Sequence, residues 1–410
     1  MDSCYAPGLI PPDIALQQQL LSITAIDKTE EVTIEDALYR VVADDISAPF
    51  SVPMVDNSAM DGYAFSGHGV TAGSQLTIVG KALAGHPFEG DVKPGECIRI
   101  MTGADLPPSC DPVLMQEKVT LDADQVVVNA DITLGQSVRK EGEDVTAGSI
   151  VVAKGTRLLP AHLSLLASLG IAQLVAYKTP IVGLMATGDE LVEPGNVLAS
   201  GQIYESNRTG LKALLAKMNV QVIDYGIIKD DQQSIAEIFT KASQECDWLI
   251  SSGGVSVGDA DYVKDVLDQN GKVDFWKVAI KPGKPYAFGK LGDCYFSGLP
   301  GNPVSSFVTF EQFVVPGLRK LSGANFNARP IFKAQLQSNF KRRPGREEYL
   351  RAFVENNEQG DAEVAILPGQ GSAVMQTYSK ANCFIKVPAQ VASMAIGDIV
   401  EVQPFFEYLQ

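Results

Sequence analysis

Cysteine and histidine are scarce in this chain of 410 residues, and those present are scattered. The sequence holds six cysteines and three histidines, and no two cysteines have the Cys-x-x-Cys spacing that is typical of zinc and redox sites. We therefore expect neither a zinc site nor a disulfide framework. Isolated cysteines also favour a reducing compartment, so the expected location is the cytoplasm.

Long apolar runs and an excess of positive charge are also absent. No run of about 18 apolar residues occurs, so we expect no membrane-spanning segment. Residues 1–10 lack the basic and apolar regions of a secretory signal. The 33 Lys and Arg residues are outnumbered by 49 Asp and Glu residues, which gives a formal net charge of −16. This charge argues against nucleic acid or an anionic membrane as a partner.

Apolar residues are plentiful at 45% of the chain, and charged residues make up 20%, as is typical of folded domains with substantial cores. A chain of this length is too long for one core, so we expect roughly two to four domains. From position 179 strands and helices alternate, which predicts a doubly wound, mostly parallel sheet with helices on both faces. The expected strands include 181–186, 220–228 and 248–250, and Asn207 is expected to cap the helix after the first of them.

The rest of the chain is predicted to form a linking domain and two β domains, so the fold class is multidomain α/β plus β. One helix is expected over 11–23, and Thr33 with Asp36 predicts a second helix over 33–42. Short apolar runs separated by turn signals indicate the β domains. The expected boundaries are 1–50 with 142–176 for the linking domain, 51–141 for an inserted β domain, 177–326 for the α/β domain and 327–410 for a C-terminal β domain.

Functional interpretation starts from residues 247–262, where a buried strand ends in two serines and two glycines. Gly253 and Gly254 allow the backbone to approach a ligand closely, because no Cβ intervenes. Successive N–H groups in such a loop form an anion-binding concavity, which would also include Ser256 and Gly258. The alternative is an ordinary strand-to-helix turn in which the following aspartates cap the helix.

Acidic residues follow the carboxyl ends of three different predicted strands. In open α/β sheets ligands bind in the crevice outside these ends, and carboxylate oxygens are the ligands that Mg²⁺ prefers. Helix capping is the alternative, because Asp favours first turns. The three pairs are Asp189 with Glu190, Asp230 with Asp231, and Asp259 with Asp261. The acids therefore predict a divalent-metal site, with magnesium as the expected ion, at this edge of the sheet.

Basic residues and a helix start are predicted beside the same crevice. Lysine binds phosphate as a point charge, although a solvated run of charge is the alternative. A helix N-terminus after a Pro-Gly-Asn-Pro loop is a further anion site. The lysines are Lys277, Lys281 and Lys284, and the loop residues are Pro300, Gly301, Asn302 and Pro303.

For several further polar residues, composition alone indicates no chemical role. Asp61 lies in a crowded acidic and aromatic segment, Thr102 ends a strand, and Asp144 lies in a charged turn. Asx-turns, hydroxyl-to-backbone bonds and solvated turns are the alternatives. In the C-terminal domain, Arg346 and Arg351 suit oxyanions but fit a surface role equally well. The same holds for Ser372.

Seven ordered motifs nevertheless form a specific pattern. They are DNSAMDGYA, RIMTGA, GEDV, TGDEL, ISSGGVSVGDADY, AIKPGKP and GLPGNPVS. Together, over about 250 residues, they resemble the molybdopterin molybdenumtransferase family, the molybdenum-insertion enzymes of molybdenum cofactor biosynthesis. The carboxy-terminal domain of gephyrin is similar.

The resemblance implies a transferase that acts on adenylylated molybdopterin and molybdate. With magnesium it would cleave the phosphoanhydride, release AMP and leave molybdenum on the dithiolene sulfurs. It further implies an elongated homodimer of four-domain subunits with its site in a cleft between subunits. Transient partners would be the molybdopterin adenylyltransferase and molybdoenzymes or their chaperones. A non-catalytic, receptor-anchoring scaffold of the gephyrin type and a general nucleotide phosphohydrolase are the alternatives.

Carried over position by position, the important residues of the family are present in this chain. Asp259 stands where relatives often carry Glu, which keeps a carboxylate. Arg346, Arg351 and Ser372 match less clearly. The expected catalytic residues are Asp61, Thr102, Glu190, Asp230 and Asp261, with Asp144, Pro300 and Pro303 as further family positions. Glu190, Asp230 and Asp261 would be the magnesium ligands, directly or through water. The glycine loop and the three lysines would hold the phosphates, and we expect Asp61 to position the pterin or the metal rather than to abstract a proton.

Overall fold

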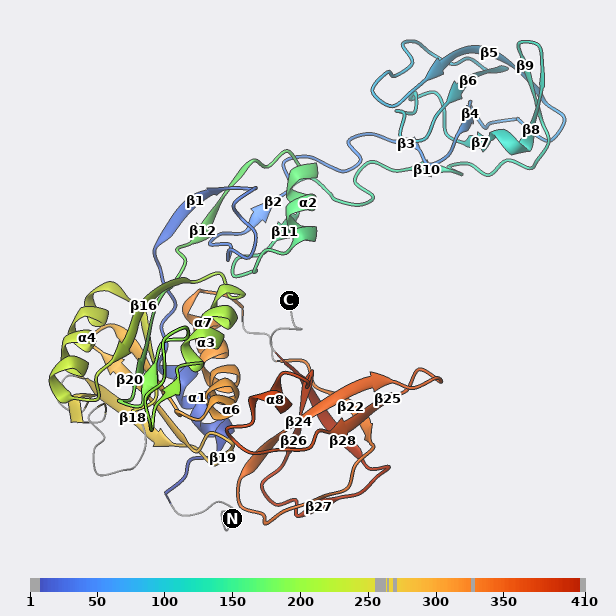
Figure 1. Ribbon diagram of the computed structural model, residues 1–410. Helices are drawn as coiled ribbons and strands as arrows, with labels where there is room; N and C mark the ends of the chain where they lie inside the picture. Colours follow the sequence, from blue (N-terminus) through green and yellow to red (C-terminus); the bar gives the residue numbers. More distant parts are fainter. Residues whose placement is uncertain (1–7, 255–262, 264, 268–270, 326–328, 406–410) are drawn as a thin grey trace.

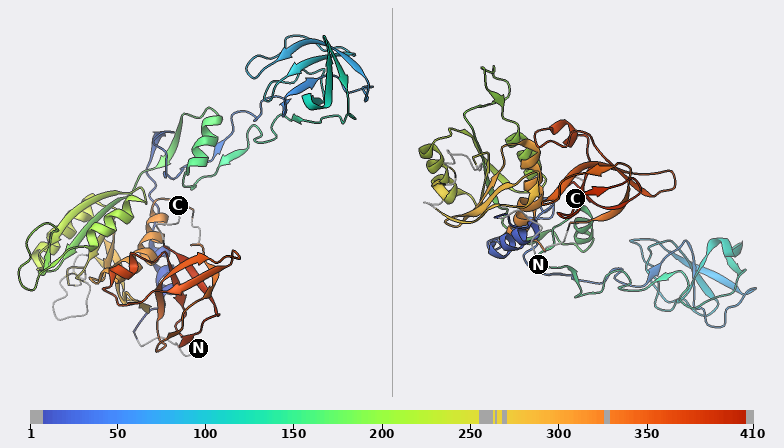
Figure 2. Two further views of the ribbon diagram at one scale, coloured as in Figure 1. Left: turned by 45° about the vertical axis from the view of Figure 1, so that its right-hand side comes forward. Right: turned by 90° about the horizontal axis from the view of Figure 1, so that it is seen from below.

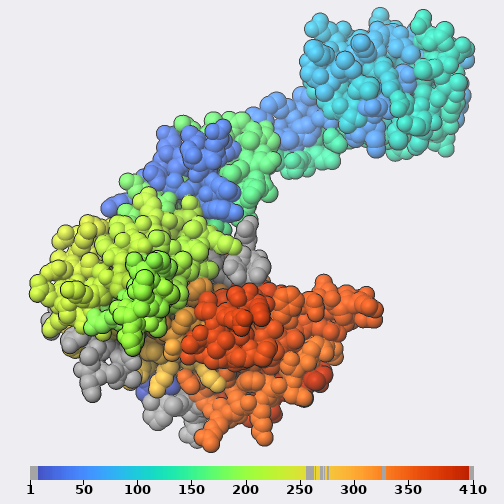
Figure 3. Space-filling view, in the orientation of Figure 1, coloured from blue at the N-terminus to red at the C-terminus, as the bar shows by residue number. Residues whose placement is uncertain are grey.

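The structure is a computed structural model that describes residues 8–254, 263, 265–267, 271–325 and 329–405. Three six-stranded sheets lie in this part of the chain. The molecule is elongated, and one sheet lies at its far end, beyond a narrower linking segment (Figures 1 and 3). None of the helices within the described residues has the length and apolar character needed to cross a bilayer.

The sheet at the far end belongs to the inserted β domain. Short strands with alternating burial pair mostly in antiparallel fashion around Ala64, Ile98 and Val113. The sheet order is β7-β4-β6-β5-β9-β8, and the strands that we expected here are confirmed. The elements are β4 (Gly62–Ala64), β5 (Gln75–Ala82), β6 (Glu96–Ile100), β7 (Val113–Met115), η1 (Gln116–Lys118), β8 (Val119–Asp122) and β9 (Gln125–Val128).

The linking segment is built from two pieces of chain that lie on either side of the inserted domain in sequence. Its strands pair across the insertion, and α2 packs on them through Leu166. The pairs are β1 (Thr29–Thr33) with β12 (Gln173–Tyr177) and β2 (Ile46–Ser47) with β11 (Ile150–Val152), and α2 spans Pro160–Ser168. The pair of β3 (Asn57–Ser58) with β10 (Val138–Arg139) lies at the base of the inserted domain (Figure 1), where Val138 packs against its core.

The prediction of a second helix over 33–42 is wrong. Thr33 does donate its hydroxyl to Asp36 Oδ2 at 2.9 Å, and the Asp36 N–H points back to Thr33 Oγ1 at 3.3 Å. This contact closes only a turn, because Tyr39 adopts φ +64 and Val42 pairs with Ala176. Pairing with the returning chain therefore overrides the local capping signal.

The α/β sheet has the order β16-β13-β17-β21-β20-β18. The first four strands are parallel, β20 runs antiparallel to β21, and β18 runs antiparallel to β20 and therefore in the direction of the first four, so the expected mostly parallel sheet is confirmed. The elements are β13 (Ile181–Thr187), β14 (Leu191–Val192), β15 (Ile203–Tyr204), α3 (Asn207–Ala216), β16 (Gln221–Ile228), α4 (Gln232–Glu245), β17 (Trp248–Ser252), β18 (Lys272–Lys277), β20 (Pro285–Leu291), β21 (Cys294–Leu299), α6 (Pro303–Thr309), η2 (Phe310–Val314) and α7 (Val315–Leu321).

Helices cover both faces of this sheet (Figure 2). Leu184 and Ile250 face a core shared with α3, α6 and α7, whereas Met185 and Leu249 face a second core shared with α4. Adjacent strand residues thus point into opposite cores, which explains the continuous apolar runs of β13 and β17.

Helix α1 (Pro12–Ser22) packs into the first of these cores rather than onto the linking strands. Gln19 is fully buried, donates its amide to the Phe313 carbonyl at 2.7 Å, and accepts from the Tyr286 hydroxyl at 2.7 Å. Tyr286 and Trp248 both contact Ser297 Oγ, at 3.1 Å. This buried polar network ties the N-terminal helix to the centre of the sheet.

The C-terminal domain carries the third sheet, and the strands expected here are confirmed. Its order is β19-β24-β25-β22-β28-β26, with a further β24–β26 pairing. Because β19 lies between β18 and β20 of the α/β sheet in sequence, the third sheet is attached to the α/β domain through its edge. The elements are β19 (Ile280–Lys281), β22 (Phe332–Leu336), β23 (Phe340–Lys341), β24 (Glu347–Asn356), β25 (Ala362–Ile366), α8 (Met375–Tyr378), β26 (Cys383–Val387), β27 (Ser393–Met394) and β28 (Ile399–Pro404).

The buried network predicts that Gln19→Ala destabilises the α/β domain. The change leaves a void and removes the partner of the Phe313 carbonyl, so we expect a loss of about 2–4 kcal/mol. Urea unfolding followed by tryptophan fluorescence measures it, because Trp248 and Trp276 both belong to this domain. Gln18→Ala, on the exposed side of the same helix, is the matched control, and equal midpoints for the two variants would contradict the prediction.

Candidate active site

A cavity of about 620 Å³ opens at the carboxyl edge of the α/β sheet. Its walls come from the ends of β13, β17 and β21 and from the segment after β16. The predicted convergence of these strand ends is therefore present in the structure, since Glu190, Asp230 and Gly253 all line this cavity.

Of the two predicted carboxylates in the cavity, Asp230 has a pKa that depends on its acidic neighbours. Asp230 accepts from the Thr187 hydroxyl at 3.2 Å. Burial raises the pKa of Asp230 despite this bond, and repulsion from Asp189, Glu190 and Asp231 adds to the increase. A hard cation would relieve both effects, so Glu190 and Asp230 fit a magnesium ion.

Asp231 has the capping role that was the alternative for these residues. It is the N-cap of α4 and accepts from the Ser234 N–H at 2.9 Å and the Ser234 hydroxyl at 2.8 Å. Its neighbour Asp230 lines the cavity instead. Of this pair, one acid therefore stabilises a helix and the other is available for ligand binding.

The glycine loop begins with two residues whose conformation excludes side chains. Gly253 has φ +93 and Gly254 has φ +70, and a Cβ on Gly253 would lie 2.6 Å from the Thr187 carbonyl oxygen. The close approach of β13 and β17 therefore requires glycine at this point. The remaining predicted loop residues, Ser256, Gly258, Asp259 and Asp261, lie outside the described residues.

No group of three or more His, Cys, Asp or Glu side chains suited to a metal occurs among the residues that the structure describes. Glu190 and Asp230 are thus the described part of the predicted ligand set, and Asp261 lies outside it. Two protein carboxylates are compatible with magnesium, which commonly keeps several waters and takes further ligands from a substrate phosphate.

The loop before α6 forms another wall of the cavity. Its lining residues are Pro300, Gly301, Asn302 and Pro303. Asn302 occupies the N-cap position with Pro303 at the first helical position, as expected, but its side chain makes no capping bond. The Val304 N–H instead donates to the Ser372 carbonyl at 3.0 Å. Ser372 therefore lies beside the cavity and contacts the helix start through its backbone.

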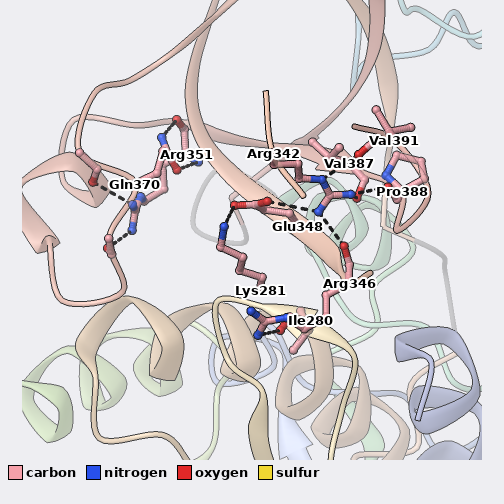
Figure 4. Close-up of polar contacts among 12 residues, drawn as sticks. Ile280, Lys281, Arg342, Arg346, Glu348, Arg351, Gln370, Val387, Pro388 and Val391 are labelled. Carbon is pink, nitrogen blue, oxygen red and sulfur yellow. Dashed lines mark hydrogen bonds and ion pairs between the residues drawn. The ribbon is translucent and has the colours of Figure 1, made fainter. Parts of the chain in front are cut away.

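The three predicted lysines do not line this cavity. Lys281 Nζ forms an ion pair with Glu348 Oε1 at 2.8 Å, and the other oxygen of Glu348 contacts Arg342 at 3.2 Å (Figure 4). Arg346 donates to the Ile280 carbonyl at 3.3 Å. Lys281 and Arg346 thus contribute to the junction between the α/β and C-terminal domains.

Arg351 is buried, with 1% of its surface exposed, so the surface role that we considered for it is wrong. Its guanidinium donates to the carbonyls of Gly369 and Gly371, each at 2.9 Å (Figure 4). Burial lowers its pKa. In this structure Arg351 fixes the loop that carries Ser372, and any effect on a ligand would pass through that loop.

Asp61 and Thr102 are brought together in the β domain, as the motifs suggest. The Thr102 N–H and hydroxyl both donate to Asp61 Oδ1 at 2.8 Å. These two bonds, with the positive charge of Arg99, lower the pKa of Asp61. The linking segment separates this sheet from the α/β sheet (Figures 1 and 2), so one chain does not bring Asp61 to the cavity. Asp144 lies in an exposed turn, where its N–H donates to the Val52 carbonyl at 3.0 Å.

Sequence reasoning missed Glu205 and gave Asn207 the wrong role. Both line the cavity. Asn207 is the first residue of α3 rather than its cap, and its amide donates to Ser252 Oγ at 2.9 Å and to the Gly301 carbonyl at 2.8 Å. Their position was a usable signal, because a helix that follows a parallel strand begins at the ligand-binding edge of the sheet.

Comparison with known proteins accounts for nearly the whole chain. Residues 10–170 match the MoeA N-terminal region (domain I and II), 183–320 a probable molybdopterin binding domain, and 333–405 the MoeA C-terminal region (domain IV). A molybdopterin molybdenumtransferase of Haemophilus influenzae is 43% identical over 395 residues, covering 96% of this chain and 98% of that protein.

Two further similarities have lower sequence identity. Molybdopterin molybdenumtransferase 2 of Mycobacterium tuberculosis is 33% identical, covering 90% of this chain and 94% of that protein. The crystal structure of a molybdopterin biosynthesis moeA protein from Pyrococcus horikoshii superposes with a TM-score of 0.83 at 31% identity, covering 97% of this chain and all of that chain. The chain therefore belongs to the molybdopterin molybdenumtransferase family of enzymes.

Proposed function

We propose that this protein inserts molybdenum from molybdate into adenylylated molybdopterin, with magnesium-dependent release of AMP. The observation that carries the proposal is the acidic cavity, where Glu190 and Asp230 face a glycine loop at the carboxyl edge of the sheet. Family membership supports a role in molybdenum cofactor biosynthesis.

The negative charge of the cavity is the reason that the proposed reaction needs a cation. The lining residues include three acids, Glu190, Glu205 and Asp230, and no lysine, arginine or histidine among those described. An anionic phosphoanhydride would be repelled from such a site without a compensating charge. Bound magnesium would neutralise the charge that develops on the anhydride oxygens. Glu190 and Asp230, with Asp261, would hold the ion directly or through water.

Backbone groups of the loops would hold the phosphates. The Gly253 N–H donates to the Leu299 carbonyl at 3.0 Å, so phosphate binding by the loop would begin at the N–H of Gly254, which has φ +70. Pro300 and Gly301 form the adjacent wall, since a Cβ on Gly301 would lie 3.9 Å from the Gly253 Cα. Together these walls would align the anhydride for cleavage and exclude bulk water.

Asp61 would position substrate rather than accept a proton. Its lowered pKa makes it a weak base, whereas its fixed contact with Thr102 gives it a defined orientation. Because the β domain lies far from the cavity of its own chain, we propose a homodimer in which Asp61 of one subunit completes the site of the other. The proposed setting is the cytoplasm, with transient contacts to the adenylyltransferase and to molybdoenzymes or their chaperones.

AMP release from adenylylated molybdopterin, in the presence of molybdate and magnesium, tests the proposed reaction. We expect turnover by the unaltered protein and a loss of about 100-fold in Asp61→Ala and Glu190→Ala, because substrate and cation lose their position. Asp105→Ala, an exposed acid in the loop after Thr102, is the control. Folded protein that releases no AMP, or that hydrolyses ATP equally fast, rejects the proposal.

Mixing two inactive variants tests the composite site. In the proposed dimer each site takes Asp61 from one subunit and Glu190 from the other. A dimer of one Asp61→Ala subunit and one Glu190→Ala subunit therefore holds one site with both residues intact and one site with neither. Random exchange of subunits should restore about a quarter of the original rate. Measured after co-expression, a rate no higher than that of either variant alone would show that the two residues act within one chain or in separate sites.

Magnesium affinity should weaken as the pH is lowered. The raised pKa of Asp230 means that protons compete with the cation at higher pH than for an ordinary aspartate. Calorimetric titration between about pH 8 and pH 5 should show this dependence, and Asp230→Asn should bind weakly throughout. Asp231→Asn retains an N-cap residue and serves as the control. A pH-independent affinity would contradict Asp230 as a ligand.

A further inference from the structure

Two oxygens in the cavity have no hydrogen-bond partner among the residues that the structure describes. They are Oε2 of Glu205 and Oδ1 of Asn207, and both are buried. Glu205 is 2% exposed and Asn207 is 7% exposed, and both side chains line the cavity. Buried acceptors without partners destabilise a fold, so their presence calls for a ligand that pairs with them.

The orientation of Asn207 follows from its contacts. Its amide nitrogen donates to Ser252 Oγ and to the Gly301 carbonyl. The Gly301 carbonyl accepts but cannot donate, so the nitrogen must face it and the oxygen must face away. Asn207 therefore presents an acceptor that the surrounding protein leaves unpaired.

The orientation of Glu205 is fixed in a similar way. Its Oε1 accepts from the backbone N–H of Arg208 at 2.8 Å. Arg208 is itself held by Asp224, at 3.0 Å, and by Glu193. This network anchors the start of α3. Only the second oxygen of Glu205 remains for a ligand.

Helix capping alone does not account for Glu205. Glu205 precedes the N-cap Ser206, and its contact with the Arg208 N–H uses one oxygen and leaves the second buried without a partner among the described residues. Burial raises the pKa of Glu205, although the Arg208 N–H and the Arg208 charge oppose the increase.

We propose that Glu205 and Asn207 form a specificity subsite that accepts two hydrogen bonds from adjacent N–H or O–H donors of the substrate. This inference rests on the proposed function and extends it. Adenylylated molybdopterin offers such donors at the ribose hydroxyls and at the amino and ring N–H groups of the pterin. The two oxygens lie at the N-terminus of α3, whose partial positive charge disfavours a second cation there.

The test uses Glu205→Gln in the full-length protein. The Arg208 N–H would hold the amide oxygen, so the amide nitrogen would point into the cavity and oppose a ligand donor. The affinity for a ligand whose donors pair with Glu205 and Asn207 should fall about 10- to 100-fold. The unfolding midpoint without ligand should stay equal or rise, because a buried charge is removed.

Calorimetry with two probes distinguishes the source of the donors. The probes are AMP with magnesium and 6-hydroxymethylpterin, which carries the amino and ring N–H groups without phosphate. Weaker binding of AMP alone assigns the subsite to the ribose, and 2′,3′-dideoxy-AMP should then bind both forms alike. Weaker binding of the pterin alone assigns the subsite to the pterin ring.

Two other variants distinguish the loss of a ligand contact from a general effect of the substitution on the structure. Glu205→Asp keeps the carboxylate and should recover most of the affinity, whereas Glu237→Gln removes an exposed charge on α4 and should change nothing. Unchanged binding of both probes by Glu205→Gln overturns the inference. A loss of affinity for magnesium alone also overturns it, in favour of a cation site. If unaltered protein binds the probes but releases no AMP, the proposed function fails while the subsite remains.

Discussion

Parallel pairing of β13, β17 and β21 is the constraint on which the candidate site depends. Parallel strands end at one edge, so residues that are far apart in sequence meet there without any contact specific to them. Thr187, Ser252 and Pro300 reach the cavity in this way. The Trp248 core and the buried Gln19 network hold the strands in register. The chemistry at the edge is therefore supported by packing several residues away from it.

The C-terminal domain is joined to this framework by a buried charge rather than by apolar contact alone. Glu348 is almost fully buried and contacts Lys281 from one domain and Arg342 from its own. A buried carboxylate is tolerated when such partners compensate it. Because β19 precedes β20 directly, and because Ser372 contacts the start of α6, this junction also borders the cavity.

The sequence was sufficient to predict the strands, the mostly parallel sheet and the convergence of Glu190 and Asp230, because apolar periodicity and strand-end position are local signals. It failed over 33–42, where pairing across the inserted domain replaced a helix. The prediction for Arg351 also failed, because the sequence does not distinguish an arginine that binds oxyanions from one that binds backbone carbonyls. Glu205 was overlooked because its significance lies in an unpaired oxygen, which only packing reveals.

The way the β domain is inserted has a consequence for how the family can vary. Its entry and exit lie side by side, because the Val52 N–H donates to the Val145 carbonyl at 2.7 Å and the two residues form an antiparallel bridge. A module attached at two neighbouring points can be enlarged, trimmed or exchanged while the strands that flank it keep their alignment. The position of Asp61 can thus change with this module, without alteration of the sheet that holds the acidic cavity.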